Sequence, residues 1–196
     1  MLGPDIRGQL EEAEQSLEEL RPIVQENPEP WIQGWPPLVA GLVAQGRGRE
    51  EEAARILAEG ARPLLGRLFV YGGKSLLLEC VRSLVRVGRA AEALPFRDRL
   101  QRLAASSTPA RAFLAWADGL LEPEPDKARA LLADAARQLE ALEHRVEVGR
   151  CLIDVAQAER RLRIDPTPTL ARAREILVSS GATLFLREVN AAPEST

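Results

Sequence analysis

The chain has 196 residues, a formal net charge of −3, 45% hydrophobic residues and only 4% aromatic residues. A chain with this share of apolar residues can form a core, and its Ala- and Leu-rich, aromatic-poor composition favours helices over strands. The mild negative charge argues against a general nucleic-acid binder, which carries an excess of basic residues.

The sequence lacks the marks of export and of membrane insertion. No apolar run reaches the ~18 residues that indicate a membrane-spanning helix, and the first residues lead into an acidic helix rather than a signal peptide. Cys80 and Cys151 lie in apolar helical sequence without a C-x-x-C pair, which is typical of buried, reduced thiols. We therefore expect a cytoplasmic protein.

The first predicted element is a helix over 5–26, and prolines follow it. Its apolar residues recur at spacings of three and four, namely Leu10, Ala13, Leu17, Leu20 and Val24. No partner helix precedes it, so the chain reads as part of a longer array. The uncovered stripe also predicts a homodimer formed through this helix.

Four helical hairpins are predicted next, over 35–62, 74–104, 109–142 and 145–180, with a short closing helix over 181–190. Their component helices are expected at 35–45, 49–61, 75–87, 91–104, 110–121, 128–142, 145–162 and 169–179, separated by glycines and prolines. Asp126 is expected to cap the sixth of these helices. The run Leu68 to Tyr71 is the one β-like stretch, and it is too short and isolated to pair.

A phrase of the form G-x-x-x-E-A recurs at Gly8, Gly48 and Gly88, 40 residues apart each time. The glycine can end a helix in the left-handed conformation, and the glutamate suits the first turn of the next helix. The alanine lets the two helices approach closely. A fixed period of this size predicts one all-α domain over 1–196, a right-handed solenoid of antiparallel helix hairpins.

The spacing of Gly41, Gly48, Ala53 and Leu57 resembles the small, glycine, alanine and large apolar positions of a tetratricopeptide repeat. Gly88, Ala93 and Ala128 match some of these positions in the following repeats. The 40-residue period is longer than that family's.

A longer, irregular repeat resembles the helical arrays of large bacterial signalling ATPases, such as the maltose-type and LuxR-type transcription activators and ATPase-linked cyclases. The stretches Ala128 to Arg145, Gly149-Arg150 and Gly181-Ala182 resemble the C-terminal parts of such chains. That resemblance implies a repeat region that senses an inducer or a protein and takes part in signal transduction or transcription regulation. No winged or helix-turn-helix DNA reader matches.

Two motifs that could carry chemistry are incomplete. Gly72-Gly73-Lys74-Ser75 resembles a phosphate loop, but Leu68 stands where that loop needs its first glycine. Glu140, His144 and Glu147 could share a helix face, but one histidine with solvated carboxylates is more typical of a surface than of a metal site. We therefore expect no catalytic residue, no metal and no cofactor.

The remaining hypothesis is a binding scaffold with a concave groove. Tetratricopeptide spacing assigns six residues to that groove: Trp35, Leu42, Ser75, Arg82, Arg86 and Phe113. Exposed aromatic residues and arginines are common binding hot spots, although inter-repeat packing would explain these positions equally well. Trp116 is assigned to the core.

The expected partner is a protein or peptide, or another domain of the same chain, with an acidic or amphipathic segment, and not a nucleic acid or a membrane. The alternative function is a small-molecule sensor, in which the groove closes into a pocket around an inducer.

Overall fold

The computed structural model describes residues 4–26, 33–66 and 73–190, and these ranges contain helices and turns but no strand. The all-α class is therefore confirmed. The β-like run Leu68 to Tyr71 lies outside the described residues. The chain divides into two compact units, Met1–Ala110 and Arg111–Thr196, and each is described by itself. The expectation of a single repeat domain over 1–196 stays a prediction.

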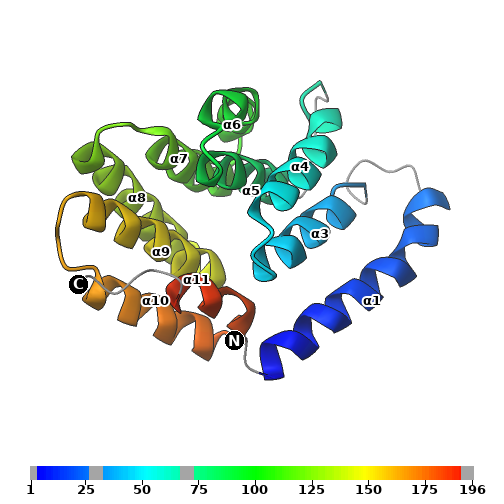
Figure 1. Ribbon diagram of the computed structural model, residues 1–196. Helices are drawn as coiled ribbons and strands as arrows, with labels where there is room; N and C mark the ends of the chain where they lie inside the picture. Colours follow the sequence, from blue (N-terminus) through cyan, green and yellow to red (C-terminus); the bar gives the residue numbers. More distant parts are fainter. Residues whose placement is uncertain (1–3, 27–32, 67–72, 191–196) are drawn as a thin grey trace. The chain divides into compact units, whose positions relative to one another are not determined.

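The first unit is built from five α-helices in its described part. These are α1 (Pro4–Glu26), α3 (Trp35–Gly46), α4 (Glu50–Ala61), α5 (Gly73–Arg86) and α6 (Ala90–Ala104), with a short 3-10 helix, η1 (Arg62–Leu64), after α4. From α3 to α6, each helix packs against the next one in the chain (Figure 1). Helix α1 has its extensive contacts with α3. The sequence placed these α-helices to within two residues, but it did not indicate η1.

The second unit contains most of α7 (Thr108–Leu121), followed by α8 (Pro125–Ala141), α9 (Arg145–Arg161) and α10 (Thr167–Ser179). A 3-10 turn, η2 (Thr183–Phe185), and α11 (Leu186–Asn190) replace the expected single closing helix. Helices α8, α9 and α10 lie side by side (Figure 1). Glu124, not Asp126, is the N-cap of α8, because Pro125 occupies the first helical position.

Five chain reversals in the described residues share one backbone motif. Each contains a residue with positive φ: Gly48 (75°), Gly88 (75°), Glu143 (59°), Arg163 (59°) and Gly181 (68°). The N–H that follows donates to a carbonyl five residues back, as from Arg89 to Leu84 at 2.8 Å. This is the Schellman arrangement, which satisfies the last carbonyls of a helix. The same following residue is the N-cap of α4, α6, α9 and η2.

Two of the three copies of the repeated phrase therefore form the expected turn. The first copy does not, because Gly8 lies inside α1. A glycine in a helix interior costs about 1 kcal/mol relative to alanine, an amount that the flanking helix-forming residues of α1 can offset. The alanine of the phrase behaves as expected in both later copies, since Ala53 and Ala93 are fully buried.

Close approach within helix pairs depends on a glycine on one helix facing a leucine on the other. A Cβ built on Gly41 would lie 2.4 Å from Leu57 Cγ, and one on Gly119 would lie 2.7 Å from Leu132 Cγ. Gly149 faces Leu177 in the same way, at 2.8 Å. The leucine side chain fills the space that the glycine leaves.

In the α5–α6 pair, the large apolar side chain stands on the first helix and not on the second. Forty residues after Gly41 stands Val81, and forty residues after Leu57 stands Arg97. Val81 is fully buried, whereas the Arg97 side chain remains partly exposed and contacts Gln101. The first helix of this pair carries the apolar bulk, so its partner can carry a charged residue without disrupting the core.

The turn motif predicts opposite effects of two substitutions. Gly88→Ala should lower the free energy of unfolding by about 1–2 kcal/mol, because an L-residue is strained at positive φ although its Cβ would meet no atom within 4 Å. Glu143→Gly should raise it by up to about 1 kcal/mol for the converse reason. Urea titrations measure both values. Gly66→Ala is the matched control, since Gly66 has open surroundings and no positive φ. Equal costs for Gly66→Ala and Gly88→Ala would contradict the backbone argument.

The glycine–leucine contact predicts coupling between α3 and α4. Gly41→Ala should destabilise by about 1–3 kcal/mol through overpacking, and Leu57→Ala by about 2–5 kcal/mol through a cavity. The double variant should lose about 0.5–3 kcal/mol less than the sum of the two single losses in the free energy of unfolding. The reason is that the new methyl group enters the space that Leu57 vacates. Simple additivity in a double-mutant cycle would show that the two residues do not share this contact.

Candidate interaction groove

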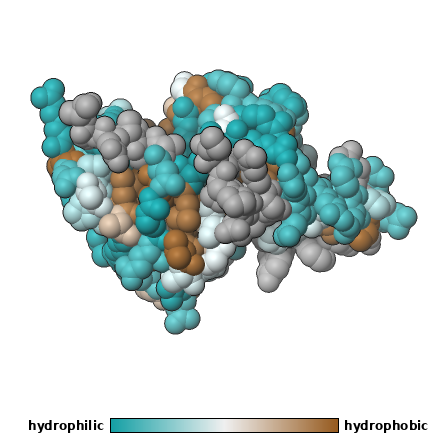
Figure 2. Space-filling model, turned by 60° about the horizontal axis from the view of Figure 1, so that its bottom comes forward, coloured by the Kyte–Doolittle hydropathy of each residue, from teal (hydrophilic) through white to brown (hydrophobic). Residues whose placement is uncertain are grey.

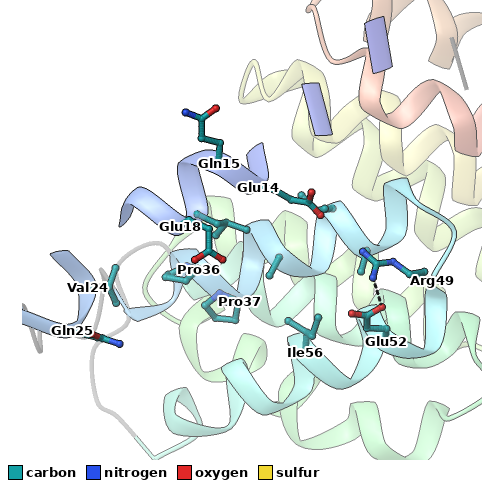
Figure 3. A pocket seen from close by; sticks show the side chains of 14 residues that line it. Glu14, Gln15, Glu18, Val24, Gln25, Pro36, Pro37, Arg49, Glu52 and Ile56 are labelled. Atoms are coloured by element: carbon teal, nitrogen blue, oxygen red, sulfur yellow. Dashed lines mark ion pairs between the residues drawn. The ribbon is translucent and has the colours of Figure 1, made fainter. Parts of the chain in front are cut away.

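A cavity of about 800 Å³ in the first unit lies between α1 and the α3–α4 pair (Figure 3). Three helices supply its walls. The lining residues are Glu14, Gln15, Leu17, Glu18, Val24, Gln25, Pro36, Pro37, Ala40, Val43, Ala44, Arg49, Glu52 and Ile56. The cavity thus has an apolar centre with charged side chains at its margins.

Two polar contacts link α1 to the segments that flank α3. At the middle of α1, Glu14 forms an ion pair with Arg47, just beyond the end of α3. Near the end of α1, the Val24 carbonyl accepts a hydrogen bond of 3.1 Å from Gln33 Nε2, just before α3. These contacts make α1 antiparallel to α3. Among the described helices of this unit, α1 has its extensive contacts with α3.

The apolar stripe of α1 is buried at one end only. Leu10 is 3% exposed, Leu17 is half-buried, and Leu20 is 40% exposed. Ile23, beside the stripe, is 51% exposed. On the face drawn in Figure 2, hydrophobic residues among those coloured form separate groups between hydrophilic ones. The stripe is therefore partly covered by α3, and its remaining surface faces the groove and solvent.

The α1 wall carries two carboxylates, Glu14 and Glu18, and belongs to an acidic helix. The helix contains seven acidic and two basic residues, so its formal net charge is −5, more negative than the whole chain at −3. Glu14 and Glu18 extend from α1 toward α3, and Glu18 points toward Pro36 and Pro37 (Figure 3). On the opposite wall Glu52 pairs with Arg49 at 2.9 Å.

The six residues assigned to a groove from the sequence lie in different environments. Trp35 is 50% exposed and precedes the groove prolines, while Leu42, Ser75 and Arg86 are partly buried. Arg82 and Phe113 are fully buried in the structure. Phe113 belongs to the second unit, where its ring meets that of His144 edge to face with centroids 6.1 Å apart. Neither Arg82 nor Phe113 therefore presents side-chain surface to a partner.

The sequence assignment missed the residues that line the cavity on α1 and α4, among them Leu17 and Ile56. A signal for the first was present, because Leu17 belongs to the apolar stripe that the sequence predicts on α1. Ile56 gave no such signal, since its spacing equally suits a core position.

A few polar side chains of the second unit lie in its packed interior. Trp116 is fully buried, as expected, and its Nε1–H donates to Asp154 Oδ2 at 2.9 Å. The Arg150 guanidinium lies 4.1 Å from the centroid of the Phe185 ring. Both contacts satisfy a polar or charged group away from water.

The two chemical motifs considered from the sequence take ordinary structural positions. Glu140 pairs with Arg172 at 2.7 Å, while His144 Nδ1 lies 3.8 Å from Glu147. Among the described residues no group of three His, Cys, Asp or Glu side chains could hold a metal ion. Lys74 and Ser75 lie in the first turn of α5, and Gly72 is outside the described residues.

Comparison of the chain with protein families, with curated proteins and with solved structures found no significant match. Within the ranges that the structure describes, no helix combines the length and the apolar character needed to cross a membrane.

Both cysteines are buried, and they should be unreactive in the native protein. Burial raises the pKa of the Cys80 thiol well above its usual value, outweighing the opposite effect of Arg62. The Cys151 thiol donates to the Leu132 carbonyl at 3.3 Å. Because the thiolate is the reactive form, a thiol reagent at neutral pH should modify neither residue until the chain is unfolded by denaturant. Rapid native labelling of Cys80 would contradict this environment.

Proposed function

We propose that the protein is a non-catalytic protein–protein interaction scaffold whose groove between α1 and α3–α4 binds a partner helix. In this proposal the chain is a tetratricopeptide-like, right-handed solenoid and forms the repeat region of a bacterial cytoplasmic regulatory or signal-transduction protein. The observation that carries the proposal is the incompletely covered apolar stripe of α1, which lines a cavity of about 800 Å³.

The form of the groove favours a helical ligand. Binding of an amphipathic helix in an apolar groove is a common mode of recognition, in which residues at i, i+3, i+4 and i+7 provide the anchors. The lining from Leu17, Val24, Val43 and Ile56 offers apolar contacts along several turns of three helices. Such a ligand would take the place that a second neighbouring helix occupies for α4 and α5.

The chemistry of the lining supports binding rather than catalysis. Its described residues include carboxylates, one guanidinium and amides, but no Ser, Cys or His that could act as nucleophile or general base. Arg49 and Glu52 pair with each other, and Glu14 pairs with Arg47. These ion pairs lie at the surface, where they act as a polar rim.

A small-molecule sensor is the second candidate, favoured by the cavity volume alone. About 800 Å³ falls within the range of roughly 300–1,000 Å³ that is usual for ligand sites. The two readings differ in what binds. Native mass spectrometry of the purified protein would show a small-molecule adduct, lost on Leu17→Asp, if the sensor function holds.

The scaffold function can be tested with fluorescent amphipathic peptides of about 18 residues, roughly five helical turns. Three peptides share one Leu stripe and carry Lys, Gln or Glu at the polar positions. At least one should bind saturably in fluorescence anisotropy. Leu17→Asp on α1 and Ile56→Asp on α4 should each weaken that binding by about tenfold or more, because a charge would be buried against apolar surface.

Val178→Asp is the matched control, since Val178 is 53% exposed on α10 in the other unit and lies outside the groove. It should change affinity less than about twofold. Circular dichroism and thermal melts establish that each variant is folded. If no peptide responds to either groove variant while the variants remain folded, the proposed function is wrong.

A further inference from the structure

We propose that the groove selects a basic amphipathic helix, one with an apolar stripe flanked by lysines or arginines. This inference rests on the proposed function and adds the chemistry of the partner. Three described features support it: the placement of carboxylates beside the apolar stripe, an arginine already bound to one of them, and the net charge of α1.

The carboxylates are placed to receive cations from a helix in the groove. Glu14 and Glu18 are one turn apart on α1, and both line the cavity beside Leu17 (Figure 3). Glu52 lines the opposite, α4 wall, where it shares its surface-exposed ion pair with Arg49. A helix whose apolar face contacts Leu17 would therefore bring its flanking side chains near carboxylates on both sides.

The ion pair between Glu14 and Arg47 shows how such a cation is held. Arg47 reaches from the end of α3 to the α1 wall, and its guanidinium meets the Glu14 carboxylate. The two side chains keep 37% and 39% of their surface exposed, so the pair is solvated and can exchange partners. A lysine or arginine of the incoming helix would add to this contact or replace it.

The charge of α1 disfavours other occupants of the groove. An acidic segment would meet a helix of net charge −5, and like charges in an interface oppose association. A second copy of the chain that used α1 would bring two such helices together. The expectation of an acidic or amphipathic partner segment rested on Arg82, Arg86 and Phe113, which do not line this cavity.

Charge selectivity is measured with the same three peptides. The Lys peptide should bind about tenfold more tightly than the Gln peptide, with the Glu peptide weakest, at about 50 mM salt, where screening is slight. Raising the salt to about 300 mM should weaken the Lys peptide most and leave the Gln peptide nearly unchanged.

Two charge-neutralising variants locate the effect. Glu14→Gln/Glu18→Gln should weaken the Lys peptide by about fivefold and leave the Gln peptide unchanged, as expected for two surface ion pairs. Glu12→Gln/Glu19→Gln is the control, because it removes the same charge from the same helix at exposed positions outside the lining. It should change affinity less than about twofold.

The outcomes separate this inference from the proposed function. Equal affinity of the three peptides, with loss of binding on Leu17→Asp, would overturn the basic partner and leave the scaffold intact. Equal losses from the two Glu→Gln pairs would also overturn it, because attraction to net charge would then suffice. A dimer in sedimentation velocity that Leu17→Asp dissociates would identify a second copy as the occupant and overturn the inference as well.

Discussion

The structure depends on one backbone constraint, the reversal of the chain between consecutive helices within very few residues. At five reversals in the described chain one residue adopts positive φ, and at four of them the next residue already serves as N-cap. Gly88 and Arg89 have these two roles between α5 and α6. The resulting short connection holds the two helices close. Helices α7 and α8 are joined by an equally short segment without such a residue. In α3–α4 the two helices meet closely where Gly41 faces Leu57.

The sequence could reveal this constraint where glycine supplies the positive φ. Gly48, Gly88 and Gly181 were all placed at helix ends in advance, and the structure confirms them. Glu143 and Arg163 adopt the same conformation, but nothing in their chemistry announces it. The helix bounds around them were still predictable, because the apolar periodicity of α8, α9 and α10 continues up to each turn. The apolar periodicity thus predicted the helices, whereas glycine indicated only those turns in which it supplies the positive φ.

The candidate site was less accessible to sequence reasoning. Trp35 was placed at an exposed helix start, and it is exposed. Arg82 was assigned to the groove by its tetratricopeptide spacing, yet it is fully buried. A charged residue within an apolar helix sequence does not reveal its own degree of burial. The stripe of α1 was recognised, but its surroundings were not, because the polar contacts that link α1 to the segments flanking α3 join Glu14 to Arg47 and Val24 to Gln33. Such contacts follow from the three-dimensional path of the chain.

Affinity and selectivity have separate physical origins in this groove. Burial of Leu17, Val24 and Ile56 against a partner would supply most of the free energy, at roughly 25 cal/mol per Å² of apolar area, and it is indifferent to charge. The carboxylates beside them are solvated, so each contributes little to affinity but opposes any partner of the same sign. The apolar contacts of α1 are therefore unselective, whereas its net charge of −5 discriminates among amphipathic partners by the sign of their charge. The same charge disfavours self-association through the exposed part of the stripe, which would otherwise be the simplest way to cover it.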